Sequence, residues 1–270
     1  PDMVIMGHAD RVDTKMLSSM KSSHKNLKIA QWFLDPLTRK GPDYNKNKSR
    51  ILDKLDSVDT TFITTDPNSL DFKIKNSFFI PNPCDESLDN LKNYNFDPDY
   101  DVFYAISHGV HRGTLRKGKM DEREIFITNL MKKTENINYD IYGMFKRQPI
   151  WGDEFIEKIS QSKMGLNLSR GKPVKYYSSD RIAQLMGNGL LTFIDKKTHY
   201  NDFFKNDEMI FYNDINDLVD KIYKYKKDKR QLRKIAKKGH EKYHKHFNSN
   251  IVAKFIIDKT LGLKSNYYWD

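Results

Sequence analysis

The chain has 270 residues, of which 31% are charged and 38% hydrophobic, and its formal net charge is +11. No apolar run is long enough to span a membrane, and the opening residues PDMVIMGHAD do not resemble a secretory signal. The single cysteine, Cys84, excludes an internal disulfide framework and a cysteine-built zinc site. We therefore expect a reducing, cytoplasmic location.

The first third of the chain alternates between short apolar runs and helical segments. Strands are predicted at PDMVIMG, KIAQWFLD, TTFITT and SFFIPNP, with helices over 13–22 and 47–55 between the first three. Strands separated by helices indicate parallel βαβ units. Because the chain opens directly in a strand, we expect the N-terminal domain to be incomplete at its start.

A second alternating series follows a polar stretch, 84–100, that reads as a linker. Strands are predicted at DVFYAIS, YDIYGM, KMGLNLS, GLLTFID and MIFY. Helices are predicted over 122–133, 151–162, within SSDRIAQLMGNG and from residue 215 onwards. The fold class is therefore α/β, with two Rossmann-like domains facing a cleft. The expected boundaries are 1–85 for the N-terminal domain, 86–250 for the C-terminal domain and 251–270 for a helix or tail.

In open parallel sheets, ligands bind beyond the carboxyl ends of the strands. His8 follows the first predicted strand and Asp35 the second. A glycine-rich, basic loop, HGVHRGTLRKGK, follows DVFYAIS and contains Arg112 and Lys117, whose side chains suit phosphate oxygens. That loop matches neither GxGxxG nor the P-loop pattern, so a solvated basic loop is an alternative.

The stretch SSDRIAQLMGNG (Ser178–Gly189) has a helix start that can be interpreted in two ways. Serines and an aspartate are common N-caps, which suits a helix that only fills the core. A free helix N-terminus, however, also attracts anions. Arg181 opposes the helix dipole, and therefore predicts a compensating phosphate or carboxylate nearby.

Two further patterns carry weaker signals. DPDYD (97–101) resembles a metal-binding carboxylate set, but it precedes a strand and lacks the glycine and glutamate of an EF-hand, so we predict no metal site. Residues 215–247 contain twelve Lys or Arg and four Asp or Glu, which places +8 of the net charge there. This stretch is interpreted as a solvated helix or as a surface attracted to an anionic membrane or substrate.

These residues together suggest a family. The stretch WGDEFIEKISQSKMGLNLSRGKPVKYYSSDRIAQLMGNGLLTFID and the tail that follows it resemble the donor domain of GT-B glycosyltransferases, closest to the spore-maturation (CgeB-like) branch. The tail offers Glu208, Tyr212 and Gly239, among others, for the family pattern. PDMVIMGHAD, KIAQWFLD and FFIPNP extend the resemblance over nearly the whole chain.

The resemblance implies a glycosyltransferase that needs no metal or other cofactor and takes a nucleoside-diphosphate sugar as donor. Ser178, Ser179 and Arg181 match the place where a helix meets the diphosphate, and Arg112 and Lys117 match a basic pair there. Gln184 stands where related enzymes often have a glutamate that bonds the ribose, and Phe145 and Trp151 lie in the region that packs the base. His8 or Asp35 is the candidate base for an inverting reaction.

The acceptor is expected to be a glycan or a lipid-linked molecule, and the charge leaves open peripheral contact with the inner face of an anionic membrane. No nucleic-acid partner is expected, because no recognition motif accompanies the charge. Two other hypotheses stay open: a non-catalytic nucleotide- or carbohydrate-binding module on a degenerate GT-B scaffold, and a basic nucleic-acid-binding protein.

Overall fold

In the computed structural model, which describes residues 1–39, 41, 43–107 and 122–270, the chain folds into two compact units. Unit 1 comprises Pro1–Asn82, Arg170–Ser178 and Ser249–Asp270, and unit 2 comprises Pro83–Ser169 and Ser179–Asn248. Two stretches from late in the sequence thus belong to the same unit as the N-terminal strands. The predicted α/β class is confirmed, because both sheets are wholly parallel and helices connect most of their strands.

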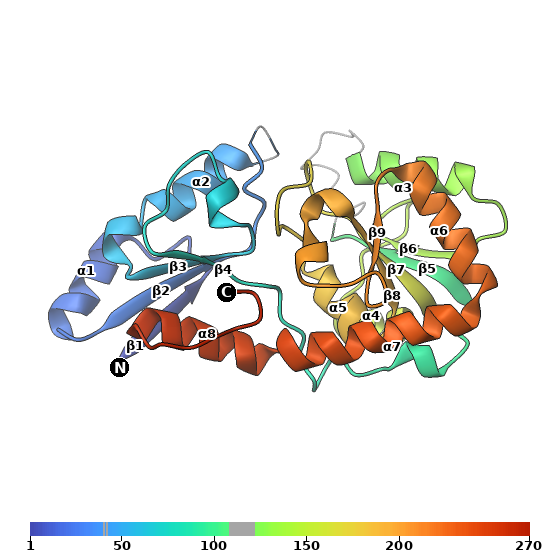
Figure 1. Cartoon of the computed structure of the whole chain (residues 1–270). Coiled ribbons are helices and arrows are strands. Elements are labelled where there is room, and N and C mark those ends of the chain that lie inside the picture. Colours follow the sequence, from blue (N-terminus) through green and yellow to red (C-terminus); the bar gives the residue numbers. More distant parts are fainter. Residues whose placement is uncertain (40, 42, 108–121) are drawn as a thin grey trace. The chain divides into compact units, whose positions relative to one another are not determined.

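Unit 1 has a four-stranded sheet in the order β1-β2-β3-β4. Its elements are β1 (Met3–Gly7), α1 (Thr14–Ser23), β2 (Lys28–Phe33), α2 (Tyr44–Leu52), β3 (Thr60–Ile63), β4 (Ser77–Phe79) and α8 (Ser249–Leu261). Short 3₁₀ turns lie at Leu55–Ser57 and Pro67–Ser69. Figure 1 shows α8 on one side of this sheet and α1 and α2 on the other.

The alternation of side chains along the strands explains these two layers. Ile29 and Phe33 of β2 join buried clusters with Leu17 of α1 and Ile51 of α2. On the other face, the ring of Phe62 packs edge-on against Phe255 of α8 at 5.8 Å. Successive strand residues point to opposite faces, so a parallel strand covered by helices on both sides is apolar along its whole length.

Unit 2 has a five-stranded sheet in the order β6-β5-β7-β8-β9. The strands are β5 (Tyr100–Ala105), β6 (Tyr139–Tyr142), β7 (Ser162–Asn167), β8 (Leu191–Asp195) and β9 (Ile210–Tyr212). The helices are α3 (Glu122–Lys133), α4 (Gly152–Ser160), α5 (Arg181–Gly187), α6 (Ile215–Lys227) and α7 (Lys229–His246), with 3₁₀ turns at Asn93–Asn95, Lys196–Thr198 and Tyr200–Asp202.

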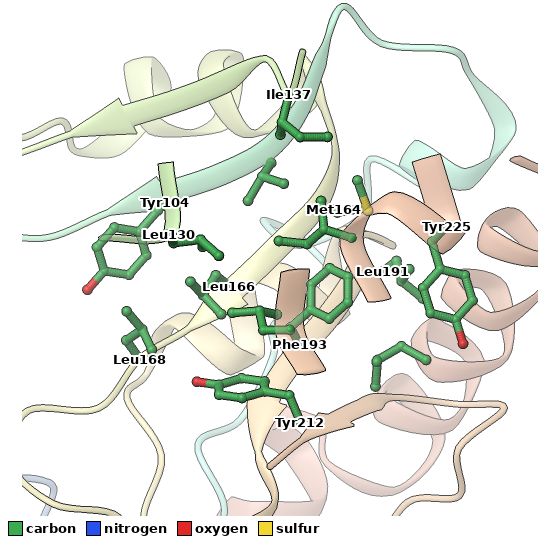
Figure 2. Close-up of a cluster of buried hydrophobic side chains, with 14 of the residues drawn as sticks. Tyr104, Leu130, Ile137, Met164, Leu166, Leu168, Leu191, Phe193, Tyr212 and Tyr225 are labelled. Atoms are coloured by element: carbon green, nitrogen blue, oxygen red, sulfur yellow. The ribbon is translucent and has the colours of Figure 1, made fainter. Parts of the chain in front are cut away.

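Each face of the unit 2 sheet has its own core. Figure 2 shows the larger one, in which Tyr104, Met164 and Phe193 from the strands meet Leu130 of α3 and Tyr225 of α6. The other face packs on α4 and α5.

Gly239 of α7 lies so close to the backbone at Glu208 that no side chain fits between them. A Cβ at this position would lie 2.2 Å from the backbone oxygen of Glu208.

The order of the unit 2 strands creates a switch point. After β5 the chain adds β6 on one side, and then returns to place β7 on the other side of β5. Connections on either side of such a point leave opposite faces of the sheet, which opens a crevice at the carboxyl ends of the two strands. The carboxyl ends of β5 and β7 are therefore where a ligand of unit 2 is expected.

Two expectations need correction. The helix predicted over 47–55 begins earlier, at Tyr44, and ends at Leu52. The stretch 84–100, predicted to be a linker, is packed into unit 2: Cys84 is fully buried, and the buried Asn93 amide donates to the carbonyls of Ile159 and Ser162. These polar residues satisfy buried backbone groups instead of facing solvent.

Candidate functional site

In unit 1, the two predicted catalytic residues are brought together. His8 directly follows β1 and Asp35 follows β2, and because these strands are parallel neighbours both side chains emerge at the same edge. His8 Nε2 lies 2.8 Å from Asp35 Oδ2, with both side chains about two-fifths exposed (42% and 41%). The His8 ring stacks on Phe33 at 5.2 Å, and its backbone is left-handed, with φ 25°. The imidazole is therefore oriented and accessible.

Arg50 of α2 joins this pair, and sequence reasoning missed it. Its Nη1 donates to Asp35 Oδ2 at 3.3 Å, and its Nη2 donates to the carboxylate of Asp10. Lys54, just after the end of α2, donates to the Ala9 carbonyl at 2.6 Å. The loop after β1 is thus tied to α2 by cations, which positions Asp35 between an imidazole and a guanidinium. A helical Arg at this place carried no sequence signal, since most such residues are solvated.

In unit 2, Arg181 lies at the switch point. The side chain is 7% exposed, and it donates from Nε to the Ala105 carbonyl at 2.6 Å and from Nη1 to the Leu168 carbonyl at 3.1 Å. It therefore bridges the ends of β5 and β7, with the guanidinium over the Tyr104 ring at 4.9 Å. Among the residues that the structure describes, no carboxylate pairs with it. The Asp180 carboxylate is the neighbour in sequence, but its contact with Arg181 is through the backbone N–H and not through the guanidinium.

Asn167, the last residue of β7, is the second feature of the switch point and was not singled out from the sequence. Its side chain is 2% exposed, and neither amide atom has a hydrogen-bond partner within the described ranges. An unsatisfied buried amide is costly, typically about 1–3 kcal/mol, so such groups are rare without a ligand or water. Arg181 and Asn167 thus both offer polar groups at the carboxyl ends of β5 and β7.

The start of α5 differs in detail from the free helix end that an anion needs. Asp180 is the N-cap, and both its carboxylate and the Ser179 hydroxyl accept from the Arg181 backbone N–H, at 3.0 and 3.2 Å. Ser178 is buried in unit 1, where Asn82 Nδ2 lies 3.3 Å from its carbonyl and hydroxyl oxygens. The three consecutive residues thus have different environments.

The remaining predicted donor residues differ in exposure. Gln184 is partly exposed in α5, and its side chain makes no hydrogen bond with the described residues. Phe145 and Trp151 are largely exposed, at 48% and 60%, after β6 and at the start of α4. Both rings are therefore accessible to a flat ligand. Arg112 and Lys117 lie outside the described residues.

The described residues offer neither a metal-binding cluster nor a helix suited to a bilayer. Within the described ranges, no three His, Cys, Asp or Glu side chains form a metal-binding group. Of the carboxylates in DPDYD, Asp101 is buried against Lys163 and Lys226, and Asp97 pairs with Lys229. Among the helices that the structure describes, none combines the length and apolar character needed to cross a bilayer.

Solved structures similar to this chain share its two-unit fold. They include TarM of S. aureus (TM-score 0.61, 13% identity, 96% of this chain and 54% of TarM) and HepE of Anabaena in complex with UDP (0.66, 9%, 97% and 79%). Sucrose-phosphate synthase of Thermosynechococcus elongatus is a third (0.57, 11%, 95% and 72%). The chain thus spans about half the length of TarM. At these identities the similarity shows the fold, which is GT-B.

Sequence comparison identifies the family. A search of curated proteins returned no match. Residues 116–258, which cover most of unit 2, the Arg170–Ser178 stretch and most of α8, match the sequence model of a family described as glycosyl transferase-like. Because that match spans more than half of the 270 residues, the chain belongs to the glycosyl transferase-like family.

Proposed function

We propose that this protein transfers a sugar from a nucleoside-diphosphate sugar to a hydroxyl of a glycan or lipid-linked acceptor, without a metal ion. Family membership supports glycosyl transfer in general. The fold relatives HepE and TarM were solved with UDP, and HepE also with UDP-glucose. The motifs around LNLS and SSDR favour the CgeB-like branch of the family.

We assign binding of the nucleotide-sugar donor to unit 2. A buried guanidinium without a carboxylate partner is electrostatically costly, and an anionic diphosphate at the switch point would offset that cost. Arg181 has N–H groups beyond the two that bond Ala105 and Leu168, and these can donate to phosphate oxygens. Because Asp180 already caps α5, we assign the diphosphate to the Arg181 side chain more than to the helix end.

We assign the other donor contacts to residues around Arg181. Asn167 is assigned to a polar group of the donor, and Gln184 and Ser179 are assigned to the ribose or phosphate. The exposed rings of Phe145 and Trp151 are assigned to the base. Arg112 and Lys117, which lie outside the described residues, are also assigned to the diphosphate, on the resemblance to the family alone. As the sugar leaves, negative charge grows on the leaving phosphate, and cations fixed in place stabilise that charge without reorganisation.

We assign the general base of the reaction to unit 1. Asp35 accepts a hydrogen bond from His8 Nε2–H, which leaves Nδ1 able to take a proton. The acceptor hydroxyl gives its proton to Nδ1 while its oxygen forms a bond to the anomeric carbon. The bond from that carbon to the diphosphate oxygen breaks, and its electron pair stays on the phosphate. The 2.8 Å contact between His8 and Asp35 is the observation that carries this proposal.

The stereochemistry of the product tests the proposal. A base that activates the acceptor directly implies a single displacement, so the product is expected to have the anomeric configuration opposite to that of the donor. NMR of the product formed from UDP-glucose or another α-linked donor reads this configuration. A retained configuration would contradict the assignment of His8 as base, and binding of UDP with no transfer to any acceptor would leave a non-catalytic module.

A second, subordinate proposal concerns α6 and α7, where contact with an anionic membrane at its cytoplasmic face fits the charge. Lys227, Arg230 and Lys234 are exposed, and none forms an ion pair with the described residues.

Binding to lipid vesicles tests this second proposal. Vesicles with anionic lipid should bind the protein more strongly than neutral vesicles, by about 1 kcal/mol per basic residue near the surface. Changing these three residues to Gln should weaken that binding. Changing the exposed Lys15, Lys25 and Lys46 of unit 1 to Gln removes the same amount of charge and should leave vesicle binding unchanged.

A further inference from the structure

A polar cavity lies at the end of the unit 1 sheet opposite to His8 and Asp35. It has a volume of about 580 Å³ and is formed at the amino ends of the strands, where Lys28 begins β2 and Thr60 begins β3. The end of α1, the loop before β4 and the end of α8 complete its walls. The strands are parallel, and His8 and Asp35 follow their carboxyl ends, so the sheet separates the two places.

Four lysines from four different segments line this cavity: Lys21, Lys28, Lys75 and Lys259. Only two carboxylates, Asp56 and Asp59, line it with them. The fold thus brings positive charges from separate parts of the sequence to one place. The lining therefore has an excess of positive charge.

The carboxylate of Asp59 is already engaged within the wall. It accepts from the Ile29 backbone N–H at 2.8 Å and pairs with Lys21 at 3.0 Å and with Lys28 at 3.6 Å. Burial alone would raise the pKa of Asp59, but the backbone hydrogen bond and the lysines lower it below its usual range. Asp59 thus stays ionised and holds two lysines in place, although one carboxylate cannot neutralise both.

The other two lysines differ from each other. Lys259 pairs with Asp270 at 2.5 Å and lies over the Phe78 ring at 5.3 Å. Lys75 is exposed, and no carboxylate pairs with it among the residues that the structure describes. The charge at Lys75 is therefore available to a ligand.

The cavity also has an apolar part. Leu55, Val58, Phe78 and Leu261 line it beside the lysines and the Asn76 amide. A simple inorganic anion would satisfy the lysines but would leave this apolar surface and most of the volume unused. A sugar has hydroxyls for polar walls and C–H groups for apolar ones, and an attached phosphate or carboxylate would meet the lysines. We propose that this cavity binds an anionic sugar, at a site separate from the one that carries out transfer.

Calorimetric titration of the intact protein at low salt tests the proposal. Glucose 6-phosphate and glucuronate represent the two kinds of anionic sugar, glucose is the neutral probe, and inorganic phosphate is the anion alone. At least one anionic sugar should bind, with glucose and phosphate at least about tenfold weaker, and added salt should weaken the binding. Whichever of glucose 6-phosphate and glucuronate binds more tightly shows whether the cavity prefers a phosphate or a carboxylate. If neither binds, or if phosphate binds as tightly as the sugar phosphate, the proposal is wrong.

Variants locate the binding. Lys75→Gln should weaken it about tenfold, because one charge-assisted contact is lost. Lys73→Gln, two residues away, exposed and outside the lining, should leave it unchanged. Unaltered unfolding temperatures would show that both variants are folded. His8→Ala should also leave this binding unchanged, whereas loss of binding in His8→Ala and not in Lys75→Gln would place the sugar at the His8–Asp35 pair and overturn the proposal.

Discussion

Replacing His8 with alanine is expected to lower kcat for sugar transfer by about 10²–10⁴-fold, the usual contribution of a general base. The affinity for nucleoside diphosphate, measured by calorimetry, should stay the same, because the donor is assigned to unit 2. Asp35→Asn should lower kcat by a comparable factor, since the amide carries no negative charge to stabilise the imidazolium and can hold the ring in the tautomer that has its proton on Nδ1.

His24→Ala is the matched control for this prediction. His24 is an exposed histidine just after α1 in the same unit, and it follows the end of a helix instead of a strand. Its replacement should leave kcat within about twofold. If His8→Ala transfers sugar at the wild-type rate while remaining folded, then His8 is a structural residue and the base lies elsewhere.

Replacing Arg181 with alanine is expected to weaken binding of UDP or another cognate nucleoside diphosphate about 10–100-fold, which corresponds to the loss of about 1.5–3 kcal/mol from charged hydrogen bonds. It should also lower the free energy of unfolding, because the carbonyls of Ala105 and Leu168 lose their donor at a buried site. Each unsatisfied group typically costs about 1–3 kcal/mol. Calorimetry and chemical denaturation measure the two effects separately.

Two further variants separate binding from stability. Arg181→Lys keeps the charge but cannot donate to two carbonyls in a fork, so it should recover part of the affinity while remaining destabilised. Arg233→Gln removes an exposed arginine of α7 that donates to the Phe96 carbonyl at 3.1 Å, and should change neither quantity strongly. Unchanged affinity for every nucleoside diphosphate in folded Arg181→Ala would rule out Arg181 as the diphosphate contact.

Much of the fold could be predicted because the strands are buried on both faces. KIAQWFLD was predicted as a strand, and β2 covers Lys28–Phe33 of it. Asp13 was placed at a helix start, and it is the N-cap of α1, accepting from the Met16 N–H at 2.8 Å. These features depend on residues close together in the sequence, where apolar runs and caps act directly.

The stretch 84–100 shows where such local reasoning stops. Its many Asp, Asn and Pro residues are typical of a linker. In the structure, Asn93 bonds carbonyls at Ile159 and Ser162, and the Cys84 N–H donates to the Phe247 carbonyl at 3.1 Å. A polar residue can be buried wherever distant backbone groups satisfy it, and no local pattern reveals those partners.

The candidate site was predictable in its parts and not in its arrangement. His8 and Asp35 were selected because each follows a strand, but their 2.8 Å contact joins residues 27 positions apart. Arg50 and Asn167 were missed because an Arg in a helix and an Asn in a strand are common. Arg50 is distinguished by its ion pair with Asp35, and Asn167 by a buried side-chain amide without a hydrogen-bond partner among the described residues.

The sequence by itself determined the α/β class, the approximate position of most elements and the resemblance to GT-B glycosyltransferases, since apolar periodicity and short motifs are local properties. Only the tertiary structure decided which strands are neighbours, and with them the switch point that Arg181 bridges. It also decided that Arg170–Ser178 and Ser249–Asp270 belong to unit 1, and that four separate lysines line one cavity. The physical reason is that packing free energy depends on contacts between segments far apart in the chain, which no single segment encodes.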